Sequence, residues 1–311
     1  MKRFPIIKHS LLWLSIWLAL IVASNLIFWR HLNLSVQFTW GVEVKTDAKL
    51  SPEEVKTALE PKLKAIWYEN PSIIVSQQDN QSTILLQVDV KNQEQVQKLS
   101  SAVNEYVWSK GKILEQSVIW ASVGEYVKNS ATKAIIWGLI VIALYMMFAF
   151  SEVRSMISPA ILALITVITL LFDIAIPSGA YGLLIALDPT VQIDLVFIAS
   201  ILTIMWYSIN DTIIIFDRVR ENMHLHEWEL KTGKMTYLRI FEDSLWQTMR
   251  RSLGTSLAAL IMISAMWVLG TGLIKTFSYV IWVGIVAGTV SSIFIAAPLA
   301  YLCIKWSKGT K

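Results

Sequence analysis

Six long runs of apolar residues, with a polar stretch after the first, make up the hydrophobic pattern of the chain. The runs cover approximately residues 11–29, 131–150, 157–177, 191–216, 253–270 and 277–304. An α-helix rises about 1.5 Å per residue, so about 20 apolar residues cross the hydrocarbon core of a bilayer. The pattern therefore predicts a polytopic α-helical membrane protein with six transmembrane helices.

The first apolar run admits two interpretations, a retained signal anchor or a cleaved signal peptide. It follows Lys2, Arg3 and Lys8, which suits either segment. A signal peptide has a shorter apolar core and ends in small residues at a cleavage site. Residues 22–24 match such a site only weakly. We therefore favour the retained anchor.

Residues 34–120 differ from the rest because they are polar and alternate between the periods of strands and helices. Strands are predicted at residues 36–45, 72–77, 83–90 and 112–119, and helices at residues 51–65 and 92–109. Ser51 supplies an N-cap and Pro52 a first-turn proline for the first of these helices. The order β-α-β-β-α-β is the ferredoxin-like arrangement. We expect an α+β ferredoxin-like domain between transmembrane helices 1 and 2.

The pattern divides the chain into residues 1–30, which hold the N-terminus and helix 1, the ferredoxin-like domain at 31–125, and a five-helix transmembrane domain at 126–311. The N-terminus, the loop at Arg154, segment 217–251 and the C-terminal tail carry fourteen Lys and Arg residues, against Lys275 on the other side. Short cytoplasmic loops are enriched in Lys and Arg. Both termini and the 217–251 loop are thus predicted to be cytoplasmic, and the ferredoxin-like domain extracytoplasmic.

Composition and charge narrow the class of protein further. Of the 311 residues, 55% are hydrophobic and 16% are charged, whereas about 25% charged residues are usual in soluble domains. The net charge of +4 is too small to indicate a nucleic-acid partner. Residues 30–133 carry twelve basic and twelve acidic side chains, a balance that favours protein contacts or an ordinary solvated surface.

Motifs of enzymes and metal sites are missing from the sequence. Residues 270–276 lack the spacing of a phosphate-binding P-loop, and residues 224–227 do not form a zinc-binding H-E-x-x-H motif. There is no G-x-S-x-G elbow. Cys303, the single cysteine, is interpreted as an inert buried thiol. We expect no enzymatic activity, no cofactor and no metal.

Three aspartates fall within or beside the apolar runs, where an ionised carboxylate is expensive. Asp194 follows Asp188 and Pro189 at the outer end of its run and can reach interfacial water, so a structural role is favoured. Asp173 lies deep in the third run, near Pro177, and its role stays open between structure and function. Asp211 is the strongest functional candidate.

Asp211 lies in a polar cluster, residues 207–212, inside an apolar helix. Arg218 follows seven residues later and falls on the same helix face. Burial favours the neutral carboxylic acid whereas a nearby arginine favours the carboxylate, and this opposition suits a reversible proton site. The alternative is an Asp-Asn pair that joins helices by hydrogen bonds.

Residues 207–222 resemble the signature of the SecF family, the smaller subunits of the SecD/SecF protein-export complex. The side chains that carry the motif are Tyr207, Ser208, Asn210, Asp211, Asp217, Arg218, Arg220, Glu221 and Asn222. Residues 247–256 resemble the family segment Q-T-L-x-R-T-x-x-T-S, and residues 284–294 resemble its last-span motif G-x-x-x-G-T-x-S-S-I-F.

The resemblance implies a member of the resistance-nodulation-division superfamily in the bacterial cytoplasmic membrane. Such a subunit pairs with SecD, associates with the SecYEG channel and uses proton flow to help pull exported, unfolded preproteins outward. Asp211 matches the proton-relay aspartate of the family and Arg251 the arginine that acts alongside it. Asp173, after Phe172, is the nearest match to a His-Asp pair of the third span.

By the same analogy, Gly41 and Gly124 are expected to lie at hinges of the external domain, whose sheet edge is expected to contact substrate. Two alternatives stay open. One is a small-molecule efflux relative in the same superfamily, which would need a second half and larger external domains. The other is a passive scaffold of the Sec channel that does not couple to protons.

Tryptophan stands where the family has glycine at Trp40, Trp120 and Trp206. The chain has 14 Trp and only 13 Gly, and these two residue types differ most in volume and backbone freedom. We therefore hypothesise that the gene comes from a lineage that reads the UGA codon as glycine. The alternative is tryptophan at the membrane interface.

Mass spectrometry of the protein from its native host tests this recoding hypothesis. We expect the intact mass and the peptides that contain residues 40, 120 and 206 to report glycine, because a tight family position excludes an indole. Tryptophan at all three positions in the native protein would refute the hypothesis.

Overall fold

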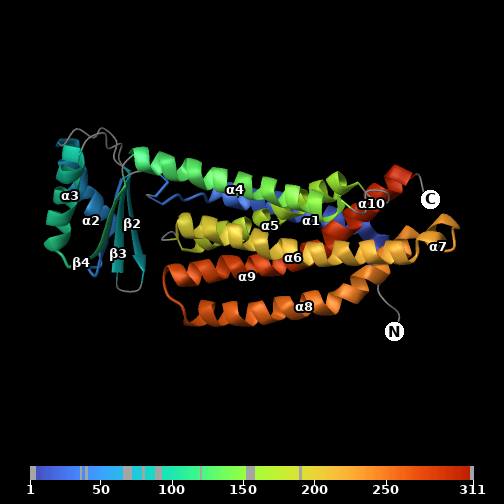
Figure 1. Cartoon of the computed structure of the whole chain (residues 1–311). Helices are drawn as coiled ribbons and strands as arrows, with labels where there is room; N and C mark the ends of the chain where they lie inside the picture. Colours follow the sequence, from blue (N-terminus) through green and yellow to red (C-terminus); the bar gives the residue numbers. More distant parts are fainter. Residues whose placement is uncertain are drawn as a thin grey trace. The chain divides into compact units, whose positions relative to one another are not determined.

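The computed structural model describes residues 5–35, 37–38, 41–65, 72–78, 81–87, 93–119, 121–151, 158–188 and 191–308 (Figure 1). The chain forms two compact units, which are described separately. The helical unit comprises Met1–His31, Ile135–Leu183 and Val196–Lys311, and the sheet unit comprises Leu32–Ala134 and Leu184–Leu195. Residues 184–195 thus group with the sheet, and the three-part division along the chain stays a prediction.

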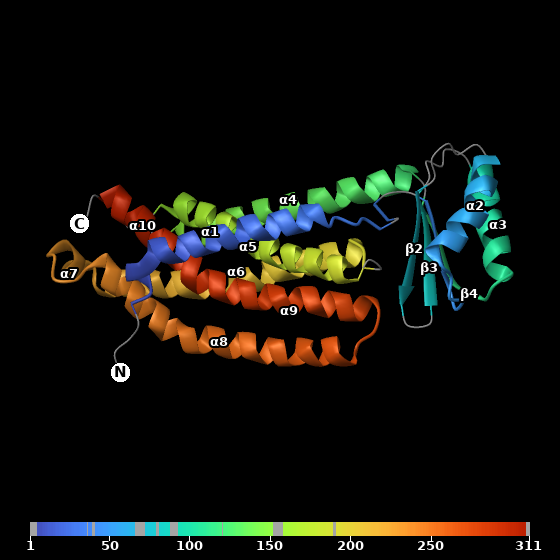
Figure 2. The ribbon, with the colours of Figure 1, turned by 180° about the vertical axis from the view of Figure 1, so that it is seen from behind.

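The sheet unit contains four antiparallel strands in the order β2-β3-β1-β4 and two helices. Along the chain the elements are β1 (Gly41–Thr46), α2 (Pro52–Ala65), β2 (Ser72–Gln78), β3 (Gln81–Gln87), α3 (Gln93–Trp108) and β4 (Ile113–Ile119). This is the β-α-β-β-α-β order that the sequence pattern predicts. Figures 1 and 2 show α2 and α3 on the same face of the sheet.

Alternation along the central strands builds the core of this unit. Val42 and Val44 of β1 are fully buried and pair with Leu86 and Ile84 of β3, because residues two apart in a strand point to the same face. Val55, Leu59 and Leu63, four residues apart on α2, are also fully buried. One apolar face of the sheet therefore packs against one apolar stripe of each helix.

The segment before β1 departs from the prediction of a strand at residues 36–45. Gln37 and Phe38 lie in a turn, and the strand begins at Gly41, whose φ is 145°. Upstream, Ser35 N–H donates to Ile193 O at 3.0 Å and Ile193 N–H donates to Asn33 O at 2.7 Å. This pairing brings residues 184–195 to the sheet unit, and it joins segments too distant in sequence for a local pattern to reveal.

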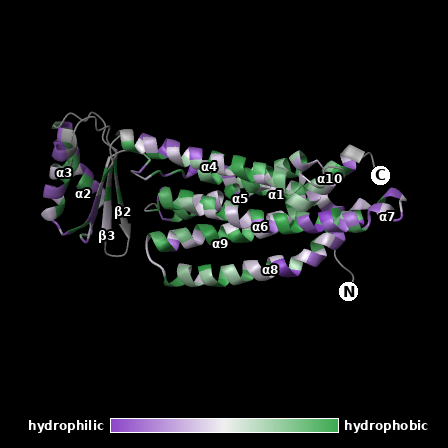
Figure 3. Cartoon of the chain, in the orientation of Figure 1, coloured by the Kyte–Doolittle hydropathy of each residue, from purple (hydrophilic) through white to green (hydrophobic). Residues whose placement is uncertain are grey.

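Six helices of the described chain are long and apolar enough to cross a membrane. They are α1 (Ser10–Arg30), α4 (Ala121–Ala149), α5 (Pro159–Leu187), α6 (Leu195–Leu225), α8 (Tyr237–Leu269) and α9 (Leu273–Ser291) continued by the π-helical turn η3 (Ser292–Ala296) and α10 (Ala297–Lys308). Figure 3 shows hydrophobic colouring over most of these helices, with hydrophilic colouring on α2, α3 and α7.

Most of segment 217–251, predicted to be a cytoplasmic loop between membrane spans, is helical. α6 continues to Leu225, the short helix α7 covers Glu227–Lys231, and α8 already begins at Tyr237. Ion pairs between residues three apart, such as Asp217 with Arg220 at 2.8 Å, support the polar turns. Hydropathy locates the part of a helix that suits hydrocarbon, whereas helix ends depend on local hydrogen bonds.

Other helix bounds also differ from the apolar runs. α5 continues ten residues past Pro177 to Leu187, and α4 begins at Ala121 rather than near residue 131. Gly124, expected at a hinge, therefore lies in the first turn of a helix, while Gly41 opens β1. Their hinge role stays a prediction. Arg154, Trp40 and Trp120 lie outside the residues that the structure describes.

Glycines allow the helices of the helical unit to approach closely. A Cβ atom at Gly179 of α5 would lie 2.5 Å from Cβ of Ser24 and 2.6 Å from its Cα, on α1. On α9, a Cβ at Gly284 would lie 2.3 Å from Ile204, and one at Gly288 would lie 3.0 Å from Cβ of Ser208. The Gly-x-x-x-Gly motif of α9 thus lets α6 pack closely against it, as small residues do in membrane helix pairs.

We predict that Gly179→Ala lowers the thermal unfolding midpoint of the protein, because the added methyl group collides with the backbone of Ser24. Overpacking of this kind costs about 1–3 kcal/mol. Gly254→Ala is the matched control, since a Cβ at Gly254 of α8 meets no atom within 4 Å and alanine favours a helix. Circular dichroism during heating in detergent measures both variants. Equal midpoints would contradict this packing.

Candidate functional site

Asp211 is buried in α6, with its side chain directed at α8. The residue is 3% exposed. Ser252 and Ser256 of α8 interact with its carboxyl group, and the charge of Arg251, also on α8, attracts it. Oδ2 of Asp211 and Oγ of Ser252 have no hydrogen-bond partner within the described part of the chain. The carboxyl group therefore has polar neighbours and spare capacity for a proton or a water molecule.

Hydroxyl groups next to Asp211 join three helices. Tyr207 of α6 donates to Oγ of Ser256 at 3.0 Å, and Ser256 shares a hydrogen bond of 2.6 Å with Oγ1 of Thr289 on α9. Thr289 also donates to its own helix at Ile285 O. This chain of hydroxyls positions Ser256 beside the carboxyl of Asp211, so the orientation of the carboxyl depends on α6, α8 and α9 together.

Asp173 is a second buried carboxyl, and it contacts α6 at Ser208, three residues before Asp211. It is 0% exposed on α5. Oγ of Ser208 donates to its Oδ2, and Ser291 of α9 interacts with it as well. Its Oδ1 has no hydrogen-bond partner among the residues described. Asp173 thus ties α5 to α6 and α9.

The end of α9 completes this polar interior. Thr212 of α6 and Ser292 of α9 share a hydrogen bond of 2.9 Å between their hydroxyl oxygens. Ser292 begins the π-helical turn η3, and such turns are frequent at functional sites because they shift the register of a helix. The turn places Ser291 and Ser292 in succession against Asp173 and Thr212.

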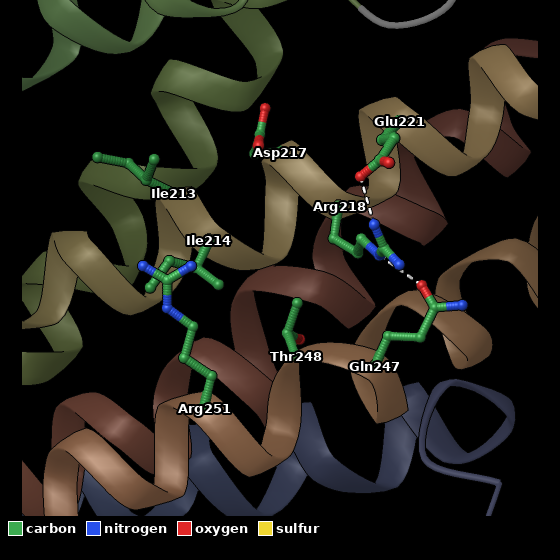
Figure 4. Close-up of a pocket in the computed structure, with 8 residues that line it drawn as sticks. All are labelled: Ile213, Ile214, Asp217, Arg218, Glu221, Gln247, Thr248 and Arg251. Atoms are coloured by element: carbon green, nitrogen blue, oxygen red, sulfur yellow. Dashed lines mark hydrogen bonds and ion pairs between the residues drawn. The ribbon is translucent and has the colours of Figure 1, made fainter.

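A cavity of about 410 Å³ lies between α6 and α8, next to this site (Figure 4). Its lining consists of Ile213, Ile214, Asp217, Arg218 and Glu221 from α6, and Gln247, Thr248 and Arg251 from α8. Figure 4 shows the Arg251 side chain extending from α8 toward Ile214. Because Arg251 both lines the cavity and attracts Asp211, it connects the buried carboxyl with the polar end of the groove.

Arg218 does not serve Asp211, contrary to the expectation from its position on the same helix face. Its Nε donates to Oε1 of Gln247 at 2.6 Å, and its Nη1 pairs with Glu221. Seven helical residues separate Arg218 from Asp211 by about 10 Å along the axis. The cation near Asp211 is Arg251, which reaches it across the interface with α8.

The remaining motif residues serve several purposes. Asn222 donates to Oγ of Ser244 at 2.8 Å and to Gln247 at 2.9 Å, which joins α6 to α8. Asn210 is exposed and donates to Trp206 O at 3.0 Å. Trp206 is 67% exposed, so packing within this chain leaves room for its indole, contrary to the tight position assumed in the recoding hypothesis.

Asp194, the third aspartate, lies in the sheet unit just before α6 begins. It is 8% exposed. Burial raises the pKa of Glu43 on β1, Lys45 opposes this shift, and the negative charges of Glu115 and Asp194 add to it. Asp194 therefore acts on an acidic neighbour in the sheet unit and is no part of the group around Asp211.

The site includes more hydroxyl side chains of α8 than the sequence motifs predict. Ser244, Thr248, Ser252 and Ser256 are all buried and follow one another at four-residue spacing, which places them on one face of the helix. This periodicity is a signal that identifies the face of α8 turned to α6. Among the described residues, no group of three or more His, Cys, Asp or Glu side chains has the arrangement of a metal site.

Comparison with known proteins places this helical site in a family. The family described as "Protein export membrane protein SecD/SecF, C-terminal" matches residues 99–306. The protein translocase subunit SecF of Sebaldella termitidis is 31% identical over 291 residues, covering 92% of this chain and 86% of that protein. SecF of Acidaminococcus fermentans is 28% identical over 303 residues, covering 96% and 97%.

The structure also resembles a solved one. The crystal structure of SecDF, a translocon-associated membrane protein from Thermus thermophilus, matches with a TM-score of 0.78 at 26% identity. The match covers 99% of this chain but 39% of the SecDF chain, so this chain spans well under half of that protein. Together with the six apolar helices, these relatives establish a multi-pass membrane protein and confirm the resemblance to SecF. The chain belongs to the SecD/SecF family of protein-export membrane proteins.

Proposed function

We propose that this chain is a SecF-like subunit that pairs with SecD and uses the proton gradient to assist Sec-dependent protein export. The observation that carries the proposal is the buried Asp211, which lies next to Arg251 and the hydroxyls of α8 and beside the cavity between α6 and α8. Its relatives are named protein translocase subunits, which supports a role in export.

Protonation of Asp211 would change the forces between α6 and α8. The ionised carboxylate attracts Arg251 and interacts with the hydroxyl groups of Ser252 and Ser256. The neutral acid loses most of this attraction, because a charged partner is worth more than a neutral one in a site of low dielectric constant. Binding of one proton would therefore shift the equilibrium between two arrangements of α6 and α8. Such a shift is required if proton transfer is to be coupled to helix movement.

The cavity supplies a route for the proton. It opens at the polar end of α6 and α8, where Asp217 and Glu221 provide carboxylates and Arg251 reaches back toward Asp211. Asp211 is not among the lining residues, so we propose that water from the cavity reaches its carboxyl past Arg251, which lines the cavity and attracts Asp211. We assign the relay role to Asp211 and Arg251 on this basis.

For Asp173 we propose a positioning role. It is fully buried, accepts from Ser208 on α6 and interacts with Ser291 on α9, whereas Arg251, which lines the α6–α8 cavity, attracts Asp211. Its carboxyl holds α6 at Ser208, three residues before Asp211. Tyr207 and Asp211 are neighbours of Ser208 on the same helix, so this anchor sets their orientation toward α8.

The partners follow from the family and from the exposed side of α6. Thr203 and Asn210 are exposed polar side chains in an apolar membrane helix, and we propose that SecD covers them. The sheet unit is proposed to be a ferredoxin-like domain on the extracytoplasmic side of the bacterial cytoplasmic membrane, where it meets unfolded preproteins leaving the SecYEG channel. Gly41 and Gly124 are the proposed hinges. Both termini are proposed to be cytoplasmic.

We predict that Asp211→Asn abolishes the acceleration of export by a proton gradient, because asparagine has no proton to exchange. Export of a preprotein arrested in SecYEG vesicles with this chain and SecD, with and without a gradient, measures the effect. Asp173→Asn is the matched control. Its amide can still accept from Ser208, so the gradient response should persist.

Three results would contradict parts of this proposal. An undiminished gradient response in Asp211→Asn would remove the relay role. Loss of the response in Asp173→Asn, with the complex assembled, would make Asp173 a proton carrier as well. Export that ignores the gradient in the unsubstituted protein would favour the passive scaffold or the efflux relative.

Cysteine labelling tests the proposed orientation. In a Cys303→Ser background, Lys112→Cys in the sheet unit and Lys231→Cys on α7 each place one thiol at an exposed position. A membrane-impermeant maleimide applied to intact spheroplasts should label Lys112→Cys, and it should label Lys231→Cys only after permeabilisation. The reverse pattern would invert the topology.

A further inference from the structure

A second cavity, of about 390 Å³, lies at the end of the helical unit where α1 begins and α10 ends. Three of its lining side chains are basic, namely Lys8, His9 and Lys305. Others are apolar and come from α1, α8 and α10, among them Leu11, Leu12 and Leu302. The cavity plays no part in the proton relay, which lies between α6 and α8.

Two of the basic side chains, those of Lys8 and Lys305, are available to a ligand. Lys8 and Lys305 are exposed, and neither pairs with a carboxylate in the part of the chain that the structure describes. The carboxylate of Glu242 is directed at the backbone, since its Oε1 accepts from Ile7 N–H at 2.6 Å and from Lys8 N–H at 3.3 Å. Glu242 therefore anchors the segment that carries Lys8 and His9 against α8.

The apolar wall of the cavity continues onto the outer surface of the helices. Leu11 is 71% exposed and Leu12 is 56% exposed, and both lie at the start of an apolar membrane helix. Trp306, next to Lys305, is 89% exposed, as tryptophans at a membrane interface are. Positive charge and an apolar surface thus meet where the bilayer headgroups begin.

We propose that this cavity binds the phosphate headgroup of an anionic phospholipid, with Lys8, His9 and Lys305 around the phosphate and an acyl chain along Leu11 and Leu12. Basic pockets between membrane helices bind such headgroups. A free phosphate would use the charges but leave the leucines uncovered, so the exposed apolar wall favours the lipid. The bound lipid would join α1, α8 and α10.

Native mass spectrometry of the purified full chain in detergent tests the proposal. Phosphatidylglycerol and phosphatidylcholine with identical acyl chains are added together, and the ratio of the two bound lipids is measured. We expect a preference for phosphatidylglycerol that falls roughly 30-fold in Lys8→Gln/Lys305→Gln, because each basic residue contributes about 1 kcal/mol. Lys231→Gln/Lys234→Gln removes the same charge from α7 and the turn after it, and should keep the preference.

Two further experiments test whether the site needs the whole lipid or only a phosphate group, and whether it needs the cavity as well as the charges. Glycerol 3-phosphate and inorganic phosphate should fail to displace the bound lipid, and efficient displacement would indicate a site for free phosphate instead. Leu302→Trp fills the cavity without changing its charge and should also lower lipid retention. Equal binding of both lipids, equal loss in the α7 control, or full retention in Leu302→Trp would overturn the proposal. The assay involves no export, so these results are independent of the relay role of Asp211.

Discussion

The close approach of α6 and α9 is the contact on which the polar interior of the helical unit depends. Gly284 and Gly288 present no Cβ to Ile204 and Ser208, so the two backbones lie near enough for short hydroxyl side chains to meet. In a bilayer there is little hydrophobic force between helices, and close packing with hydrogen bonds has to hold them together. The hydrogen bond between Thr212 of α6 and Ser292, directly after α9, follows from this close approach.

This packing gives the two buried carboxyls different environments. Among the residues that the structure describes, Asp173 meets hydroxyl groups from α6 and α9 but no cation, so its site favours a fixed hydrogen-bonding arrangement. Asp211 meets hydroxyl groups and the charge of Arg251, beside a cavity. A carboxyl that exchanges protons needs both a partner that stabilises its charge and access to water. Asp211 has such a partner in Arg251, which also lines the cavity, and this favours it as the proposed proton site. Asp173 holds the same helix three residues earlier, at Ser208.

The sequence predicts what local patterns determine, and it misses what depends on distant segments. Six apolar runs and the alternation in residues 34–120 correspond to six long helices and to the β-α-β-β-α-β order. Asp211 stands out because its residue type is costly in hydrocarbon. The pairing of Asp173 with Ser208 is set by the packing of α5, α6 and α9, which no pattern within one helix reveals. The choice of Arg218 failed for the same reason, since its helix face was right but its partner came from α8.

The exposed surface of α6 indicates contact with a helix of another chain. A membrane helix with exposed Thr203 and Asn210 places polar groups where lipid cannot hydrogen-bond to them, although Asn210 uses part of its capacity on Trp206 O. Polar groups in hydrocarbon cost free energy unless another helix satisfies them. Trp206 lies between these two positions and is mostly exposed, so a covering helix would also decide whether an indole fits there. The helix that carries Asp211, the proposed proton site, therefore has an outer face that a partner helix would complete, and such a partner would lie close to any change in the charge of Asp211.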